Sequence, residues 1–385
     1  MAGTQPEVLE DILVVELGTM VTAPLAGMLL GDMGARVIKV ELPGTGDPFR
    51  GHGGGLYSPP FVAYNRGKES LQLDLRSDEG RDDLARLLAR ADVVIENFRP
   101  GVMERMGFDA ARLAELNPRL IRASITGFGK DGPYRSRPSY DSVTMALSGM
   151  ASLLLDRQDP HVTGPTIADN ITGMYAAQGV LGALVRRAST GLGGHVEVNM
   201  LEASISFVPD AFAQYDRGGV VSTPNTRVAI SQSYALVCGD GRLLALHMSS
   251  VDKFWRGLLS VIGRHELAED ERFATPAGRR ANYTALRSIL SGIFLGKDRA
   301  DWIAALAEAE VPAAPVHDID EVAADPQVSH LGTFTFSEHP VMGKITGIKS
   351  PISIDAQRRD RLVPPPVLGA DSEALAREFG LNSVA

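Results

Sequence analysis

The chain has 385 residues, of which 44% are hydrophobic, and a formal net charge of −9 at pH 7. This length predicts about two domains with packed cores, and the acidic balance excludes the basic patch that a nucleic-acid-binding protein usually carries. The single cysteine, Cys238, excludes an internal disulfide framework and indicates a cytoplasmic protein, and no apolar run or leader pattern predicts a membrane span or a secretory signal.

The first part of the chain alternates strand and helix signals. An apolar run at 12–17 predicts a buried strand, the spacing at 22–34 predicts a helix, and residues 36–41 predict the next strand. Ser77 is a good N-cap for a further helix over 77–91, and strands are predicted at 92–98 and 120–129. This alternation predicts an α/β fold with a parallel sheet covered on both faces, in a large Rossmann-like domain.

The pattern changes after about residue 225. Residues 234–248 predict a hairpin with Asp240 and Gly241 at its turn, helical patterns follow between 251 and 309, and a strand signal returns at 343–355. We therefore expect a large domain over 1–225, a smaller α+β domain over 226–325, and a return of 326–385 to the large domain.

Asp169 stands at the start of a long apolar helix predicted over 166–188, with Asn170 beside it. Asp is a favoured N-cap because its side chain accepts a backbone N–H that the helix leaves unpaired. The partial positive charge of a helix start also keeps a carboxylate ionised, which would suit a nucleophile. From this segment alone the cap is the better-supported interpretation, and the nucleophile stays open.

The familiar cofactor and metal motifs are missing from the sequence. Residues 18–24 read GTMVTAP, which lacks the second glycine of a dinucleotide-binding turn, although Glu41 ends the second strand where a ribose-binding acid would stand. There is no phosphate-binding P-loop, no nucleophile elbow, and no HExxH, CxxC or close histidine pair. We therefore expect neither a metal nor a prosthetic group.

Five segments carry a family resemblance, and they follow one another in the family's order. They are residues 22–51, 65–80, 91–108 (with the specific stretch VIENFRPGVMERMGF), 125–141 and 167–184. On these segments the chain resembles the class III CoA-transferases, which include formyl-CoA and carnitine CoA-transferases together with the α-methylacyl-CoA racemases. The resemblance implies an enzyme that moves CoA from an acyl-CoA donor to a carboxylic acid acceptor, with CoA thioesters as substrates. It also implies a homodimer whose two chains interlock.

The resemblance makes Asp169 the catalytic nucleophile. The family's mechanism implies a mixed anhydride between Asp169 and the acyl group, followed by an aspartyl-CoA thioester. Residues carried over for CoA binding are those of a first loop, of the segment LDLR, of the turn after the strand VVIE, of a short basic turn and of a later loop. They are Met20, Val21, Thr22, Leu73, Leu75, Arg76, Asn97, Phe98, Arg99, Arg105, Met106, Arg137 and Tyr140.

Some positions depart from the family pattern. Leu42 stands where formyl-CoA enzymes have an arginine, and no glycine run lies between 225 and 265 to shield an intermediate. Racemases of the family use a His-Asp pair where this chain has Tyr140 and Asp141, so one base of a two-base mechanism is missing. A racemase therefore remains the alternative function, and a CoA-binding scaffold without activity is the third possibility. Candidates for holding the acceptor acid are Arg227, His247 and Lys253.

Overall fold

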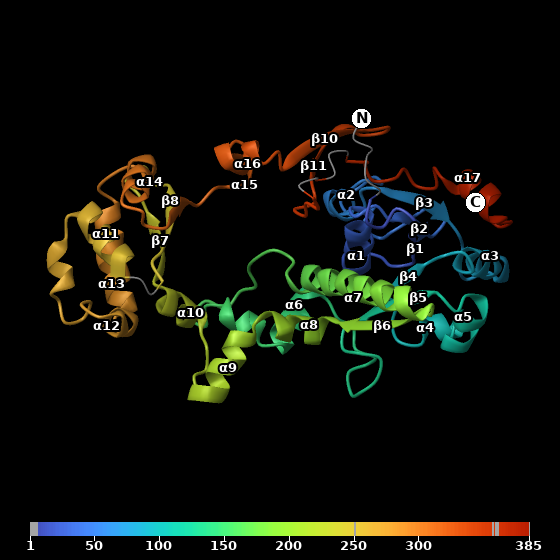
Figure 1. Ribbon diagram of the computed structural model, residues 1–385, viewed down its shortest axis with the longest axis horizontal. Helices are drawn as coiled ribbons and strands as arrows, with labels where there is room; N and C mark the ends of the chain where they lie inside the picture. The colour runs from blue at the N-terminus through green and yellow to red at the C-terminus, as the bar shows by residue number, and fades with distance from the viewer. Residues whose placement is uncertain (1–6, 250–251, 356–357, 359–361, 385) are drawn as a thin grey trace. The chain divides into compact units, whose positions relative to one another are not determined.

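The computed structural model describes residues 7–249, 252–355, 358 and 362–384 (Figure 1). Contacts within the chain form two compact units. The first unit comprises residues 1–151, 162–209 and 332–385, and the second comprises 152–161 and 210–331. The expected domain boundaries at 225 and 325 stay predictions.

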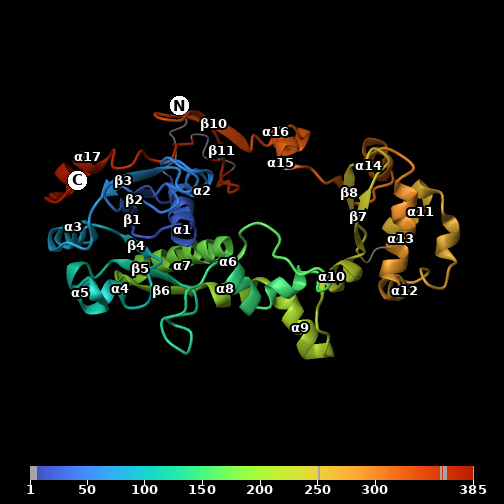
Figure 2. The same ribbon diagram turned by 180° about the vertical axis from the view of Figure 1, so that it is seen from behind.

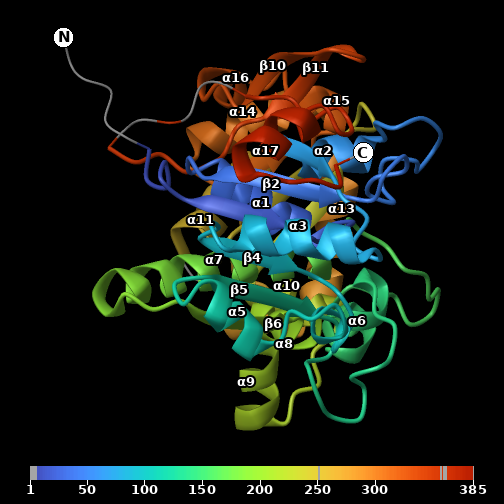
Figure 3. The ribbon, with the colours of Figure 1, turned by 90° about the vertical axis from the view of Figure 1, so that its right-hand side faces the viewer.

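The first unit is built on a six-stranded parallel sheet, as the alternating sequence pattern predicts. Its strand order is β3-β2-β1-β4-β5-β6, and each neighbouring pair is parallel. The strands are β1 (Leu13–Glu16), β2 (Arg36–Glu41), β3 (Lys68–Gln72), β4 (Val93–Glu96), β5 (Ile121–Thr126) and β6 (Gly194–Asn199). Figure 3 shows β2, β4, β5 and β6 following one another in this order.

Helices cover both faces of the sheet because successive side chains of a strand point to opposite sides. Val14 packs with the apolar side chains of α1 and α7 on one face, and Val15 packs with those of α3, α5 and α17 on the other. The helices of this unit are α1 (Thr22–Gly31), α2 (Pro59–Tyr64), α3 (Asp78–Leu88), α4 (Val102–Arg105), α5 (Ala110–Leu116), α6 (Asp141–Leu147), α7 (Ala168–Thr190), α8 (Met200–Phe207) and α17 (Ser372–Phe379).

The strand order places a change of direction between β1 and β4. The chain leaves β1 for one side of the sheet and leaves β4 for the other, so the connections that follow these two strands diverge. In open parallel sheets such a switch point at the carboxyl ends of the strands forms a crevice where ligands bind. The segments after β1 and after β4 are therefore the first place to look for a site.

The C-terminal segment closes one edge of this sheet. Helix α17 lies beside β3 (Figures 1 and 2). The Asp371 carboxylate accepts the Ser70 N–H at 2.8 Å, and the Ser372 hydroxyl accepts the Gln72 N–H at 3.1 Å. These contacts satisfy N–H groups that an edge strand would otherwise expose. A two-stranded antiparallel ribbon of β10 (Phe334–His339) and β11 (Gly343–Ile348) precedes α17.

The second unit has its own small antiparallel sheet and core. The predicted hairpin is confirmed as β7 (Ser233–Val237) and β8 (Leu243–His247), with Gly241 at a φ of 77° in the turn. A third strand, β9 (Ala313–Pro315), pairs with β8. Its helices include α9 (Pro209–Gly218), α10 (Pro224–Ser231), α11 (Asp252–Ile262), α12 (Pro276–Ala281), α13 (Tyr283–Phe294), α14 (Arg299–Glu308), α15 (Ile319–Val322) and α16 (Pro326–His330). Every helix among the described residues is too short or too polar to cross a lipid bilayer.

Candidate active site

A cavity of about 350 Å³ lies at the switch point of the sheet. Its wall combines the loop after β1, the turn after β4, the segment after β5 and the start of α7, all within the first unit. Nine of the residues predicted for the site line it, namely Met20, Val21, Thr22, Asn97, Phe98, Arg99, Arg137, Tyr140 and Asp169. Residues that are far apart in the sequence thus meet where the fold predicts a ligand site.

Asp169 is the one acid among the described residues that line this cavity. It is the second residue of α7, and the N-cap is Ile167, which makes no side-chain capping hydrogen bond. The interpretation of Asp169 as the cap is therefore wrong, because the helix begins at Ala168, two residues earlier than a cap at 169 requires. Instead, the Asp169 N–H donates to Oδ1 of Asp141 at 3.2 Å.

Burial and a like charge control the ionisation of Asp169. Burial, and to a smaller extent the nearby Asp141, raise the pKa of Asp169 to about 6. The sequence predicted that the helix start would keep this group ionised, and the raised pKa shows that its surroundings oppose this. At pH 7 a group with this pKa is still about nine-tenths ionised. A half-buried carboxylate of this kind is less solvated and more basic than an ordinary surface aspartate.

The loop between β1 and α1 is held in place by Asn97. Asn97 Oδ1 accepts the Thr19 N–H at 3.0 Å, and Asn97 Nδ2 donates to the Thr19 carbonyl at 2.8 Å and to the Thr22 hydroxyl at 3.0 Å. Gly18 lets the loop pack closely against both neighbours, because a Cβ there would lie 2.2 Å from the Ala23 side chain and 3.0 Å from Asn97 Oδ1. Asn97 thus connects the turn after β4 to the loop after β1, which are two segments of the cavity wall.

Two kinds of group that can bind an anion occur at or beside this cavity, namely backbone N–H groups at the start of α1 and arginine side chains. Among the described residues, no hydrogen bond joins the backbone N–H of Val21, Thr22 or Ala23 to another group, as is usual in the first turn of a helix. Arg99 and Arg135 line the cavity without an acidic partner among the described residues, and Arg137 stacks on the Tyr134 ring at 3.8 Å. Free N–H groups and unpaired guanidinium groups favour a negatively charged ligand.

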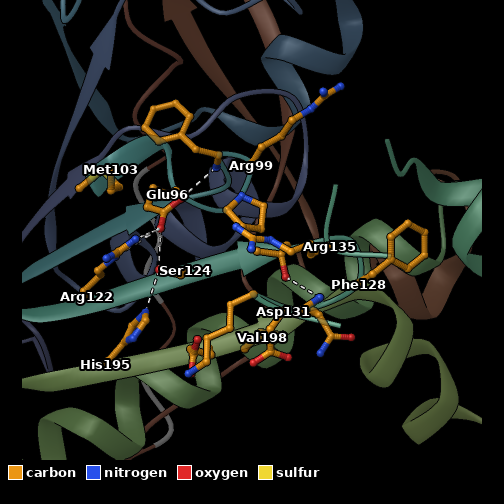
Figure 4. A pocket seen from close by; sticks show the side chains of 18 of the residues that line it. Glu96, Arg99, Met103, Arg122, Ser124, Phe128, Asp131, Arg135, His195 and Val198 are labelled. Atoms are coloured by element: carbon orange, nitrogen blue, oxygen red, sulfur yellow. Dashed lines mark hydrogen bonds and ion pairs between the residues drawn. The ribbon is translucent and has the colours of Figure 1, made fainter. Parts of the chain in front are cut away.

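A second cavity of about 730 Å³ adjoins the first and shares part of its wall. The shared residues are Phe98, Arg99, Pro100, Thr126, Phe128 and Arg135. Figure 4 shows a polar network on its floor: Glu96 accepts from Ser124 at 2.5 Å and from Arg122 at 3.0 Å, and His195 Nε2 lies 2.8 Å from the Ser124 hydroxyl. Burial and the charge of Arg122 lower the pKa of His195.

The remaining predicted residues lie outside both cavities. Leu73 is 1% exposed and belongs to the apolar core under α3, so its side chain is closed to a ligand. Leu75 and Met106 pack against the same core. Arg76 is exposed and paired with Asp74 at 2.7 Å, and Arg105 is exposed on α4. CoA contacts by these five residues stay predictions.

Sequence reasoning missed several residues of the site. Arg135, Thr126 and Phe128 line both cavities, and Asp141 contacts Asp169 directly. The motif at 125–141 contains all four, so their segment was recognised but their roles were not.

In the second unit, Lys253 pairs with Glu310 at 2.6 Å and His247 lies between Ser233 and Ser249. No cluster of His, Cys, Asp and Glu able to hold a metal occurs among the residues that the structure describes.

Comparison with known proteins identifies the family. A sequence model of CoA-transferase family III matches residues 9–372. An acetyl-CoA:oxalate CoA-transferase of Acetobacter aceti is 34% identical, over 83% of this chain and 83% of that protein. A succinate–glutarate CoA-transferase of Agrobacterium fabrum is 34% identical, over 96% of this chain and 95% of that protein.

Solved structures agree with this result. A CAIB/BAIF family protein from Brucella suis superimposes with a TM-score of 0.85 at 34% identity, covering 97% of this chain and 100% of that one. Rv3272 from Mycobacterium tuberculosis superimposes with a TM-score of 0.84 at 30% identity, covering 97% of this chain and 100% of that one. The named relatives are transferases, which does not favour the racemase alternative. The chain therefore belongs to CoA-transferase family III and is a class III CoA-transferase acting between an acyl-CoA and a carboxylate.

Proposed function

We propose that Asp169 is the nucleophile of the transfer reaction. The observation that carries this proposal is its place as the one acid among the described residues of the switch-point cavity. The cavity wall brings arginines and free N–H groups, which suit anionic substrates, but no described histidine, cysteine or lysine that could take the nucleophile's place. A carboxylate is itself a competent nucleophile toward a thioester.

The reaction follows from this carboxylate in four steps. Asp169 attacks the thioester carbonyl carbon of the donor and the C–S bond breaks. CoA departs as the thiolate, and a mixed anhydride between Asp169 and the acyl group remains. The thiolate then attacks the aspartyl carbonyl, which releases the donor acid and forms an aspartyl-CoA thioester. The acceptor carboxylate attacks that thioester, releases the thiolate and forms a second anhydride. The thiolate finally attacks the acceptor's acyl carbon, which gives the new acyl-CoA and restores the Asp169 carboxylate.

The surroundings of Asp169 support these steps. Oxygen atoms gain negative charge when a nucleophile adds to a carbonyl group, and preorganised N–H donors stabilise that charge. The N–H groups of Val21 and Thr22, two residues of the cavity wall at the start of α1, are suitable donors. Arg99, Arg135 and Arg137 supply positive charge for the phosphates of CoA or for the acid. The adjoining cavity gives room for the parts of the substrates that do not react.

The substrate acids are inferred from the relatives. The curated relatives act, by their names, on oxalate, on succinate and glutarate, and on succinyl-CoA with D-citramalate. We propose that this protein exchanges CoA between short dicarboxylic acids of this kind. An assay of acetyl-CoA and succinyl-CoA against oxalate, glutarate and a monocarboxylate panel tests the assignment. Exchange confined to monocarboxylic acids would overturn it.

Substitution of Asp169 tests its role. Asp169→Asn keeps the shape of the side chain but cannot form an anhydride, so transfer should fall to the background rate while acyl-CoA still binds. Removing a covalent nucleophile typically costs several orders of magnitude in rate. Measurement of transfer by the appearance of the second acyl-CoA, together with CoA binding by calorimetry, separates the two effects. An Asn variant with more than a small fraction of normal activity would contradict the proposal.

A further inference from the structure

Six charged side chains are buried together beneath the loop that precedes α1. None of them is more than 4% exposed, and three are acids and three are bases, so that their charges balance. They come from the end of β1, from β2, from the start of β3 and from the segment between β2 and α2. They are Glu16, Lys39, Glu41, Asp47, Arg50 and Lys68.

Short ion pairs join these side chains into one network. Lys39 Nζ lies 2.9 Å from Glu16 Oε1 and 2.9 Å from Asp47 Oδ2, and Lys68 Nζ lies 2.8 Å from Glu16 Oε2. Arg50 and Glu41 pair at 2.7 Å, and a Glu41 oxygen also accepts the Asp47 N–H at 3.0 Å. Burial opposes the charge of Lys39, but Glu16, Asp47 and Glu41 raise its pKa above the usual value.

The network makes direct contact with the loop of the cavity. Lys39 Nζ donates to the Gly18 carbonyl at 2.9 Å, and the two Asp47 oxygens accept the Met20 N–H at 3.2 Å each. Lys68 Nζ donates to the Pro24 carbonyl at 2.9 Å, in the first turn of α1. The loop therefore makes hydrogen bonds to the buried charged residues and also to Asn97.

Met20 shows why the loop needs such support. Its φ is 67°, a left-handed conformation that residues other than glycine rarely adopt. A conformation of this kind persists only where the surrounding structure imposes it, and such positions gather at functional sites. The N–H of this same residue is the group that Asp47 binds.

Stability alone does not account for this arrangement. Taking charges out of water is expensive, and buried ion pairs replaced by apolar residues of similar size often leave a protein equally or more stable. None of the six residues lines the cavity, so they do not bind substrate themselves. Three of them, Lys39, Asp47 and Lys68, contact the loop after β1 or the first turn of α1, and this part of the chain contributes to the cavity wall.

We infer that Lys39 and Asp47 are positioning residues for CoA transfer, which hold residues 18–22 in the conformation that the reaction at Asp169 requires. The inference rests on the proposed function. Lys39 fixes the Gly18 carbonyl, Asp47 fixes the Met20 N–H, and the next N–H groups along the chain are those that we place at the developing oxyanion. A displacement of this loop would leave substrate binding largely intact but would misalign the donors with the reacting carbonyl.

The test removes the ion pair without leaving a buried charge unpaired. In the double variant Lys39→Met with Asp47→Asn, Glu16 keeps Lys68 and Glu41 keeps Arg50. We expect kcat to fall about ten- to a hundredfold, because small displacements of catalytic groups are costly, while KM for acyl-CoA changes by less than about threefold. Hydrogen exchange at the Met20 amide should become faster than in the wild type.

A matched control is a second ion pair at the C-terminal end of α1. Arg66 pairs with Asp32, the C-cap of α1, at 2.5 Å, and both side chains are largely buried. The double variant Arg66→Met with Asp32→Asn should lose stability but keep kcat. If the Lys39 variant does not fold, Asp47→Asn alone is measured in the same way, and it should show the same division between kcat and KM in smaller degree.

The decisive measurement is the rate at which one equivalent of acyl-CoA modifies Asp169 in each variant. Slow modification in the Lys39–Asp47 variant, at normal rate in the control, supports the inference. The inference is overturned if Asp169 is modified at the wild-type rate in a folded Lys39–Asp47 variant. It is also overturned if the rate of modification falls equally in the Lys39–Asp47 and the Arg66–Asp32 variants. A wild-type enzyme that transfers CoA without modifying Asp169 would instead overturn the proposed function.

Discussion

At the scale of single residues, the site is governed by the position of one carboxylate. Asp169 must be ionised to attack a thioester, yet burial and Asp141 raise its pKa to about 6. A less solvated carboxylate is the better nucleophile, so the site gains reactivity in return for a narrower pH range. The same two causes lead to two separate predictions, one for activity and one for stability.

The rate of transfer should depend on pH through Asp169. The protonated acid is no nucleophile, so the rate should fall as the pH drops through about 6 and should level off above it. Asp141→Asn removes the like charge but leaves an oxygen to accept the Asp169 N–H, so it should move this limb to lower pH. Rates measured with saturating substrates between pH 4.5 and 8.5 check both statements. An unchanged limb in the Asn variant would mean that Asp141 does not act on Asp169.

Asp169→Asn should also make the protein more stable at alkaline pH. An acid whose pKa is raised from 3.8 to about 6 destabilises the folded state above pH 6, and this cost disappears below the unfolded value near pH 4. Allowing for its partial exposure, we expect a gain of about 1–2 kcal/mol at pH 8 and none at pH 4. Urea unfolding at the two pH values measures the difference. A variant less stable than the wild type at pH 8 would contradict the assigned pKa.

The sequence predicted much of the site but not how its parts interact. Asp169 and the residues of the loops after β1 and β4 could be named from motifs, and the structure brings them to one cavity. The contact between Asp141 and Asp169 joins residues 28 positions apart, and no local pattern reveals it. The helix start was misplaced because Asp suits both the N-cap and the first turn of a helix.

At the scale of elements, the site depends on close packing between α1 and α7. A Cβ at Gly173 of α7 would lie 2.8 Å from the Thr22 carbonyl and 3.0 Å from the Leu25 side chain. Glycine therefore lets α7, which carries Asp169, approach the start of α1, which carries the free N–H groups. Movement of one helix would change the geometry between nucleophile and donors.

Gly173→Ala should damage both stability and transfer. Overpacking in a filled interior costs about 1–3 kcal/mol, and a displaced α1 should also lower kcat. Gly182→Ala on the same helix is the control, because nothing lies within 4 Å of a Cβ there. That change should be neutral or stabilise by up to about 1 kcal/mol through helix propensity. Thermal unfolding and steady-state rates for the two variants provide the comparison, and similar behaviour of both would refute the packing argument.

Sequence patterns predicted some elements well and others poorly, for physical reasons. β1, α1 and β2 carry apolar periodicity and were predicted, as was the hairpin around Gly241. β3 was missed because its sequence KESLQ is polar, and Lys68 is buried there through its ion pair with the distant Glu16. β6 was not predicted either, although its sequence alternates polar and apolar residues, which is a strand signal.

At the scale of the whole molecule, the prediction concerns assembly. Residues 332–385 belong to the same contact unit as the first 151 residues, so the chain leaves this unit and returns to it. Such a path suits the interlocked homodimer that the family resemblance implies. We predict a dimer that does not dissociate on dilution without unfolding. Analytical sedimentation at nanomolar concentration should find the dimer alone, and a folded monomer under those conditions would disprove the interlocking.

If Asp169 is the nucleophile, it becomes covalently modified during transfer, and hydroxylamine should trap this modification. The wild-type enzyme is mixed with acyl-CoA in the absence of an acceptor acid, trapped with hydroxylamine, digested and analysed by mass spectrometry. We expect a hydroxamate on the peptide that contains Asp169, and none in the Asp169→Asn variant treated in parallel. A modification that maps to another residue, or active enzyme in which Asp169 is never modified, would show that Asp169 is not the nucleophile.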